Sequence, residues 1–232
     1  MREIIFDTET TGLDPRSGHR LVEIGCVELI DRRESGRTFH AYFHPERDMP
    51  AEAEAVHGLS IQFLSDKPLF AACVDELLAF LGDAPMVAHN AAFDFGFINA
   101  ELARAGHPAL DMARMCCTVQ MARKLHPGAK HSLDALCTRY GIDRSHRVKH
   151  GALLDAELLA HLYIEMTGGR QIGLGLAASS TVAAATVASP GPAVAPSRPF
   201  REPRPHAATP AELARHAEFV AALHQPLWHD SP

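Results

Sequence analysis

The chain opens with an apolar run, Ile4 to Phe6, that leads directly into two acidic residues, Asp7 and Glu9. Residues two apart in a β-strand project from the same face, so this spacing directs both carboxylates at one spot. Two negative charges held that close raise each other's pKa unless a cation lies between them. Carboxylate oxygens are hard ligands that suit Mg²⁺ or Mn²⁺. The opening therefore predicts a strand ending at a cation site, although a strand-end aspartate and a solvated turn glutamate would give the same short pattern.

Two further acidic residues lie where buried elements begin or end. Met86 to His89 is typical of a short buried strand, Asn90 is a natural helix N-cap, and Asp94 falls in the first turn of the helix that follows. Later, His150 precedes Asp155 by five residues, which would put the two side chains about 140° apart on a continuous helix. We therefore expect His150 on the loop before the helix, free to reach what Asp155 holds.

The remaining hydrophobic patterns alternate between strands and helices. Strands are expected at residues 20–30 and 37–43, joined by a turn at 31–36. Helices are expected at 51–65 (broken at Gly58), 69–81, 93–105, 116–125, 132–140 and 153–166. This order indicates an α/β layered domain with a mixed sheet, in which active sites collect at strand ends.

Three of these motifs carry a family resemblance. Asp7-x-Glu9, Asn90-x-x-Phe93-Asp94 and His150-x-x-x-x-Asp155 resemble, in that order, the motifs of the DEDD exonucleases, in the subtype with histidine as base. The resemblance covers roughly residues 1 to 168. Longer stretches are similar to the proofreading (epsilon) subunits of bacterial DNA polymerase III: residues 7–12, Val56-His57-Gly58-Leu59, residues 89–94 and residues 150–155.

The resemblance implies a ribonuclease H-like fold, with a mixed five-stranded sheet flanked by helices, and a 3′–5′ exonuclease that uses two divalent cations, Mg²⁺ or Mn²⁺. It implies that the metal ligands are Asp7, Glu9, Asp94 and Asp155, with Asp7 as the bridge and His150 as the base. The implied substrate-binding residues are Asp7, Glu9, Thr10, Thr11, Gly12, Glu52, His57, Asn90, Phe93 and Asp155. A plain turn at 10–12, an ordinary first-turn helix acid at Glu52 and a core position for Phe93 remain alternatives.

Composition limits how the chain can use DNA. Lys and Arg number 22 against 28 Asp and Glu, for a net charge of −6, which is unusual for a protein that binds DNA through its overall field. We therefore expect weak DNA binding by the chain alone, with a partner holding the duplex and this chain gripping a single-stranded 3′ end. The five cysteines lack C-x-x-C spacing and are expected to be buried and reduced. The sequence shows no signal peptide or 18-residue apolar run, so we expect a cytoplasmic protein without a membrane segment.

The C-terminal part differs in composition from the first 169 residues, which are expected to form the exonuclease domain. Residues 170–176 contain Gln171, Leu174 and Leu176, a pattern that resembles the peptide by which polymerase partners bind the bacterial sliding clamp. Residues 177–208 are rich in Ala, Pro, Ser and Val and are expected to form a flexible linker.

Residues 209–232 are expected to form a polymerase-binding segment. Thr209-Pro210-Ala211-Glu212 is a capping box with proline at the first helical position, so a C-terminal helix should begin there. A lone helix of about 15 residues is marginal in water and needs a surface to fold against, in cis or in trans. The resemblance implies the catalytic (alpha) subunit of DNA polymerase III, contacted through Leu213, Ala217, Val220 and Trp228, and it allows a small accessory subunit of the polymerase core.

Two other functions fit parts of the sequence. A free-standing 3′–5′ RNA-trimming exonuclease of the same superfamily would share the motifs, but it would need neither the clamp peptide nor the tethered helix. A catalytically idle adaptor between clamp and polymerase would need the tail, but not the full set of acids with a histidine.

Overall fold

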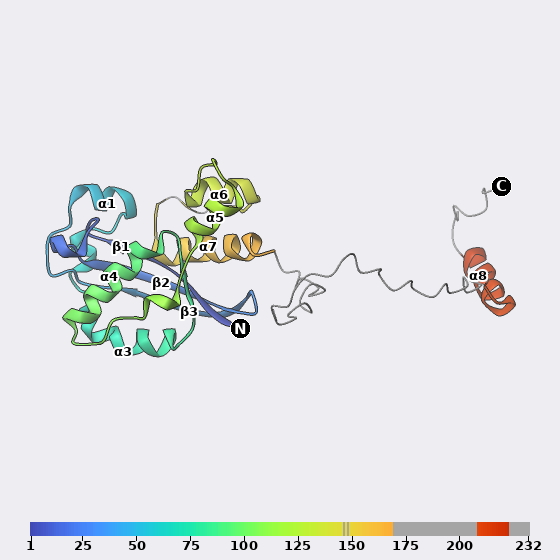
Figure 1. The fold of residues 1–232 in the computed structure, drawn as a ribbon, viewed down its shortest axis with the longest axis horizontal. Helices are drawn as coiled ribbons and strands as arrows, with labels where there is room; N and C mark the ends of the chain where they lie inside the picture. Colours follow the sequence, from blue (N-terminus) through green and yellow to red (C-terminus); the bar gives the residue numbers. More distant parts are fainter. Residues whose placement is uncertain (146, 148, 169–207, 223–232) are drawn as a thin grey trace, which may run out of the picture. The chain divides into compact units, whose positions relative to one another are not determined.

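The computed structural model describes residues 1–145, 147, 149–168 and 208–222. Within the first of its two compact units, a mixed five-stranded sheet in the order β3-β2-β1-β4-β5 lies between helices (Figure 1). This confirms the expected α/β fold class. The strands are β1 (Arg2–Thr10), β2 (Leu21–Ile30), β3 (Arg33–Tyr42), β4 (Met86–Ala88) and β5 (Met115–Cys117). The helices are α1 (Ala51–His57), α2 (Ile61–Leu64), α3 (Phe70–Leu81), α4 (Ala91–Arg104), α5 (Thr118–Leu125), α6 (Leu133–Tyr140), α7 (Ala152–Met166) and α8 (Pro210–Ala222), with short 3-10 turns at Pro15–Ser17 and Met112–Arg114.

The first three strands form an antiparallel meander. β1 pairs with β2 from Arg2 to Thr10, and β2 pairs with β3 through a two-residue turn at Asp31 and Arg32. Both turn residues have positive φ, which suits the tight turn that joins twisted antiparallel strands. The expected turn at residues 31–36 was therefore too long, because Arg33 to Gly36 already belong to β3.

β4 and β5 add the parallel half of the sheet. β4 pairs with β1, and β5 pairs with β4. The helix expected from residue 116 was wrong at its start, since Cys116 and Cys117 are the last two residues of β5. A three-residue strand is too short to show the alternation of apolar and polar residues that identifies a strand, so its residues resemble the start of the amphipathic helix that follows.

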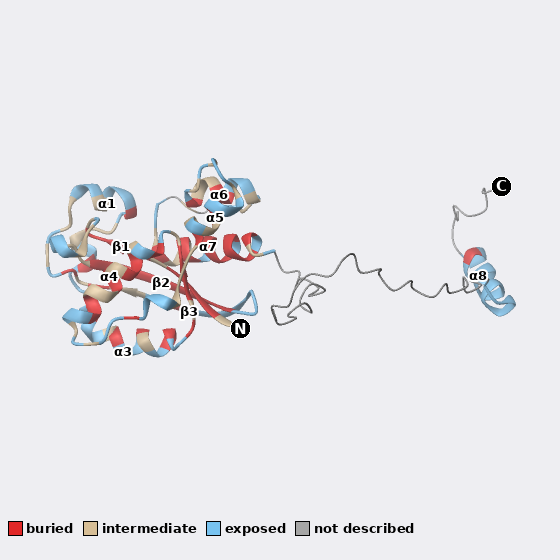
Figure 2. Cartoon of the chain, in the orientation of Figure 1, coloured by how far each residue is buried: buried red, intermediate tan, exposed pale blue. Residues whose placement is uncertain are grey.

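The sheet divides the core into two layers because successive side chains of β1 point to opposite faces. Ile4 and Phe6 pack with residues of α3 and α4, whereas Ile5 packs with residues of α6 and α7. The strands consequently lie between two buried layers (Figure 2). Of the five cysteines, Cys26 and Cys137 are buried, whereas Cys73, Cys116 and Cys117 are only partly buried, and all five are free thiols.

The N-caps expected for α4 and α6 differ in how they work. The Ser132 hydroxyl accepts a hydrogen bond from the Ala135 amide at 3.3 Å, as the N-cap of α6 should. Asn90 occupies the N-cap position of α4, but its φ is +70° and its side chain makes no capping hydrogen bond, so the expected capping mechanism was wrong. Asparagine suits this place because it tolerates the left-handed conformation.

The C-terminal helix α8 begins as expected. The Glu212 carboxylate accepts hydrogen bonds from the amide and hydroxyl of Thr209, both at 2.8 Å, which completes the capping box. Across the ranges that the structure describes, no helix has both the length and the apolar character needed to cross a membrane.

Candidate active site

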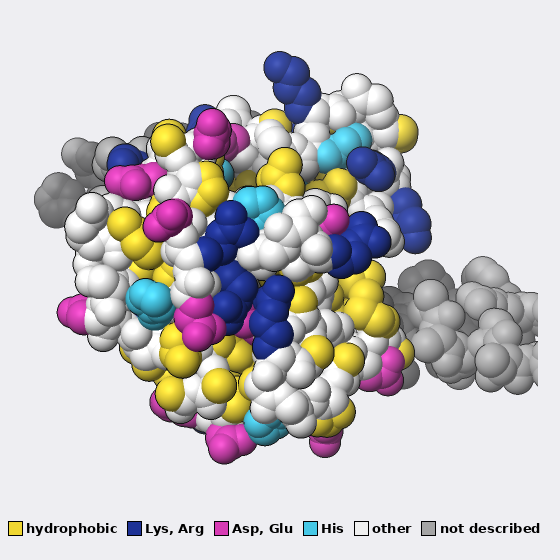
Figure 3. Space-filling model, turned by 90° about the vertical axis from the view of Figure 1, so that its left-hand side faces the viewer, with side chains coloured by type: hydrophobic (Ala, Val, Ile, Leu, Met, Phe, Trp, Pro, Cys, Tyr) yellow, Lys and Arg dark blue, Asp and Glu magenta, His cyan; other side chains and the backbone are white. Residues whose placement is uncertain are grey.

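Residues from three separate parts of the chain meet in one cleft of about 290 Å³. β1 contributes Asp7 and Glu9, the first turn of α4 contributes Asp94, the first turn of α7 contributes Asp155, and the loop before α7 contributes His150. All five predicted catalytic residues line this cleft, although they are up to 148 positions apart in the sequence. Lys and Arg side chains, with acidic ones among them, also gather near the centre of the molecular face shown in Figure 3.

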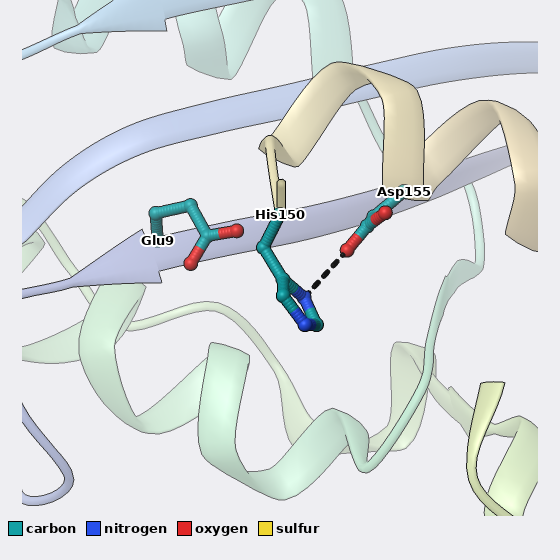
Figure 4. A group of neighbouring side chains, drawn as sticks. All are labelled: Glu9, His150 and Asp155. Atoms are coloured by element: carbon teal, nitrogen blue, oxygen red, sulfur yellow. Dashed lines mark hydrogen bonds and ion pairs between the residues drawn. The ribbon is translucent and has the colours of Figure 1, made fainter. Parts of the chain in front are cut away.

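His150 lies between two of the acids (Figure 4). Its Nδ1 atom lies 3.0 Å from Oδ2 of Asp155, and one ligand atom each from Glu9, His150 and Asp155 fit within 4.8 Å of one another. Asp7 and Asp94 line the same cleft outside this tight trio. When the Nδ1 hydrogen is donated to Asp155, Nε2 of the imidazole keeps a lone pair that can accept a proton.

The acids of the cleft disfavour one another's charges. Burial raises the pKa of Glu9 to about 8, helped by the negative charges of Glu23, Asp155 and Asp94. Burial also raises the pKa of Asp94 to about 7, although the hydrogen bond from Thr8 opposes the shift. The pKa of Asp7 is raised well above its ordinary value by burial and by its acidic neighbours, with Asp94 the strongest of them.

Such a cluster is costly in the charged form unless cations neutralise it. Its donors are carboxylate oxygens with one imidazole, the set that divalent ions such as Mg²⁺ and Mn²⁺ accept. The residues present therefore fit a divalent metal site.

Arg147 supplies positive charge inside the same cleft. Its Nε lies 2.5 Å from Oδ1 of Asp155 and its Nη2 lies 2.6 Å from Oδ2, while Nη1 lies 2.7 Å from Oδ1 of Asp134. Nη2 is also 2.6 Å from Nδ1 of His150. The two-point ion pair between Arg147 and Asp155 could not be predicted from the sequence, because residue spacing does not show which carboxylate a loop arginine reaches.

Two supporting residues escaped the sequence analysis. The buried Thr8 hydroxyl donates to Oδ1 of Asp94 at 2.7 Å and holds that carboxylate in place. Gly25, in β2, lies against the start of α7, since a Cβ on Gly25 would stand 2.2 Å from the Leu153 nitrogen. Glycine inside a strand pattern is a signal of close backbone approach, so Gly25 could have been found. Thr8 left no such signal.

A second pocket of about 580 Å³ adjoins the acidic cleft and shares Thr8, Glu9 and Phe93 with it. Most of the residues assigned to substrate binding line it, namely Glu9, Thr10, Thr11, Gly12, Glu52, His57 and Phe93. Phe93 is half-buried, packs on the core and still faces both cavities, so both of its expected roles fit its position. Asn90 is exposed and is not among the residues that line either cavity.

His57 is unusual among the residues of this pocket. It is buried, its Nδ1 accepts a hydrogen bond from the Leu59 amide at 3.0 Å, and its Nε2 has no hydrogen-bond partner of good geometry within the described part of the chain. Burial lowers its pKa, although the backbone of Thr10 and the charge of Glu23 oppose the shift. A neutral imidazole with Nδ1 as acceptor carries its hydrogen on Nε2, which is a buried donor beside the pocket.

Comparisons with known proteins agree with this geometry. A sequence model of the family described as "Exonuclease" matches residues 4–163. The DNA polymerase III subunit epsilon of Rickettsia felis is 53% identical over 174 residues, which cover 74% of this chain and 76% of that protein. The chain belongs to the exonuclease family. The epsilon subunit of Escherichia coli is 46% identical over 176 residues, which cover 73% of this chain and 72% of that protein.

Solved structures share the fold of this exonuclease. Exonuclease X, in complex with 5′-overhanging duplex DNA, has a TM-score of 0.55 at 26% identity and covers 71% of this chain and 90% of its own. The nuclease domain of 3′hExo, a DEDDh family member bound to rAMP, has a TM-score of 0.63 at 17% identity, and the match covers 72% of this chain and 91% of that domain. At this identity the likeness shows a shared fold only.

The structure describes only some of the residues assigned to clamp binding and polymerase binding. Gln171, Leu174, Leu176 and Trp228 lie outside the described residues, as does nearly all of the expected linker at 177–208. On α8, Leu213 and Ala217 are exposed whereas Val220 is buried. The polymerase-binding and clamp-binding assignments therefore remain predictions.

Proposed function

We propose that this exonuclease is the proofreading subunit of a replicative DNA polymerase and removes mispaired nucleotides from the 3′ end of DNA. The observation that carries the proposal is the continuity of the two cavities: one, lined by acids and His150, adjoins another of nucleotide size that shares Glu9 and Phe93 with it. A terminal nucleotide in the second cavity would place its phosphate beside the acids of the first.

In this mechanism, Asp7, Glu9, Asp94 and Asp155 would hold two divalent cations, and Asp7 would be the ligand shared between them. When bound, the cations supply a nucleophilic water at neutral pH and stabilise the charge that develops on the phosphate. His150, as neutral imidazole, accepts the proton of the attacking water. Glu52, His57 and residues 10–12 hold the sugar and base of the terminal nucleotide, and Phe93 stacks beside it.

The test is hydrolysis of a 5′-labelled primer that ends in a 3′ mismatch, with Mn²⁺ or Mg²⁺ and with excess EDTA. The wild-type chain should shorten the primer from its 3′ end only when metal is present. Asp7→Ala and Asp155→Ala should abolish hydrolysis even at high metal concentration, whereas His150→Ala should lower the rate far more than it weakens metal binding. Activity retained by Asp7→Ala would overturn the metal assignment.

The RNA-trimming alternative is distinguished by its substrate. DNA and RNA oligonucleotides of one sequence should be compared at equal metal concentration, and faster hydrolysis of the RNA would favour trimming. The idle-adaptor alternative predicts no hydrolysis of either oligonucleotide in Mn²⁺.

Partners follow from the relatives, which are named as subunits of DNA polymerase III. We assign residues 1–169 to catalysis, 170–176 to the sliding clamp, 177–208 to a linker and 209–232 to the catalytic (alpha) subunit, in the cytoplasm, where a replicative polymerase works. A pull-down with the alpha subunit should retain the full chain and lose a chain cut at Gly169. Equal recovery of both chains would refute this role for the tail.

A further inference from the structure

Arg147 occupies both carboxylate oxygens of Asp155, the acid that the proposed function assigns to a cation. The contacts run from Nε to Oδ1 at 2.5 Å and from Nη2 to Oδ2 at 2.6 Å. Side-chain exposure is 9% for Arg147 and 3% for Asp155, so the pair is screened little by solvent. A cation bound to Asp155 has to take an oxygen from this guanidinium and to approach its positive charge.

Arg147 has a second acid within reach on the other side. Its Nη1 lies 2.7 Å from Oδ1 of Asp134, in α6, whose side chain is 49% exposed. Removing every partner from a buried arginine would be strongly unfavourable, whereas an arginine that keeps one carboxylate remains paired. Asp134 therefore allows Arg147 to leave Asp155 at a limited cost.

We propose that Arg147 competes with a divalent cation for Asp155, and that Asp134 keeps the guanidinium paired when the cation binds. The Arg147–Asp134 pair then sets the metal affinity of the site. The inference rests on the proposed function, because it takes Asp155 as a metal ligand.

Movement of Arg147 away from Asp155 would also change the hydrogen bonding of His150. Nη2 of Arg147 lies 2.6 Å from Nδ1 of His150, and Oδ2 of Asp155 lies 3.0 Å from that same nitrogen. A ring nitrogen can accept from the guanidinium or donate to the carboxylate, but not both. Withdrawal of Arg147 leaves Nδ1 to donate to Asp155, and Nε2 then carries the lone pair that takes the proton from water. Arg147 is thus a positioning residue that links cation binding to the tautomer of the base.

The experiment measures Mn²⁺ binding to the full chain without DNA, by calorimetry and by the electron paramagnetic resonance signal of free Mn²⁺. Arg147→Ala should bind Mn²⁺ at Asp155 at least about tenfold more tightly than the wild type, because one positive charge leaves the cleft. Asp134→Asn should bind it more weakly, because Arg147 loses its other carboxylate. The matched control is Arg139→Ala, which removes one positive charge from an exposed position on α6, the helix that carries Asp134.

The double variant Arg147→Ala/Asp134→Asn separates competition from simple charge effects. Competition predicts that Asp134→Asn has little effect once Arg147 is absent, whereas a purely electrostatic effect of Asp134 would persist undiminished and would overturn the proposal. Unchanged or weaker Mn²⁺ binding by Arg147→Ala would also overturn it. If Arg147→Ala does not fold, Arg147→Lys serves in its place: a lysine cannot bond both oxygens in a fork, so affinity should still rise, and a fall would contradict the proposal.

Failure of this inference can be told from failure of the proposed function. A wild-type chain that binds no Mn²⁺ refutes both. A wild-type chain that binds Mn²⁺ and degrades DNA, but shows no gain of affinity in Arg147→Ala, refutes the role of Arg147 alone.

Discussion

Gly25→Ala should damage catalysis by displacing the start of α7, although Gly25 itself does not line the acidic cleft. A Cβ at Gly25 would lie 2.2 Å from the Leu153 nitrogen, 2.3 Å from its Cα and 2.4 Å from the Ala152 carbonyl carbon, all backbone atoms. Ordinary contact begins at 3.4 Å, so the start of α7 must move away from β2 by about 1.2 Å. That turn follows His150 and carries Asp155, so both residues move with it.

A misplacement of about 1 Å in a catalytic group can cost on the order of 100-fold in rate. We expect kcat on the mismatched primer to fall by roughly that factor, and overpacking to lower the free energy of unfolding by about 1–3 kcal/mol. The control is Gly96→Ala in α4, where an added Cβ has no neighbour within 4 Å. That change should leave the rate unaltered and raise stability by up to about 1 kcal/mol. Wild-type kcat in Gly25→Ala, with an unchanged melting temperature, would refute the close packing of α7 on β2.

Three further predictions follow from the acids and the nucleotide pocket. The pKa values of Glu9 and Asp94 rise from ordinary values of 4.5 and 3.8 to about 8 and about 7. At pH values between the ordinary and the raised pKa, the folded protein therefore binds more protons than the unfolded chain does. The melting temperature of the metal-free chain should therefore fall as pH rises from about 4 to 8, and saturating Mg²⁺ or the Glu9→Gln variant should flatten that slope; a rise with pH would contradict the shifts. Thr8→Val removes the hydrogen bond to Asp94 and should raise the half-saturating Mg²⁺ concentration on the order of tenfold, measured by initial rates. An unchanged Mg²⁺ requirement would show that this hydrogen bond does not support the site. His57→Phe keeps an aromatic ring but removes both the Nε2 donor and the Nδ1 acceptor of the Leu59 amide, so KM for the primer should rise about fivefold in steady-state assays. An unaltered KM would remove His57 from the set of substrate-binding residues.

Local patterns predicted most of the architecture because each depends on neighbouring residues. The apolar run into Asp7 and Glu9, the cap at Ser132 and the capping box at Thr209 all lie where expected. The same reasoning failed at Cys116, where a three-residue strand has no period to detect, and at Arg33, where polar residues on an exposed edge strand imitate a turn.

The site was less accessible to sequence reasoning because its details depend on contacts between distant segments. The motifs identified Asp94 and Asp155, yet no local pattern links Thr8 to Asp94 across 86 positions or places Arg147 on Asp155. Gly25 is an intermediate case, since a glycine within a strand indicates close approach without showing which helix approaches.

The central claim is that Asp7, Glu9, Asp94 and Asp155 hold divalent cations beside His150. It is tested most directly by an anomalous-difference map from crystals of the chain grown with Mn²⁺ and a nucleoside 5′-monophosphate. The account predicts two manganese peaks among these four carboxylates, with the phosphate beside them and the base in the cavity lined by His57 and Phe93. A cleft without manganese in crystals saturated with the ion, or peaks only at other acids, would contradict it.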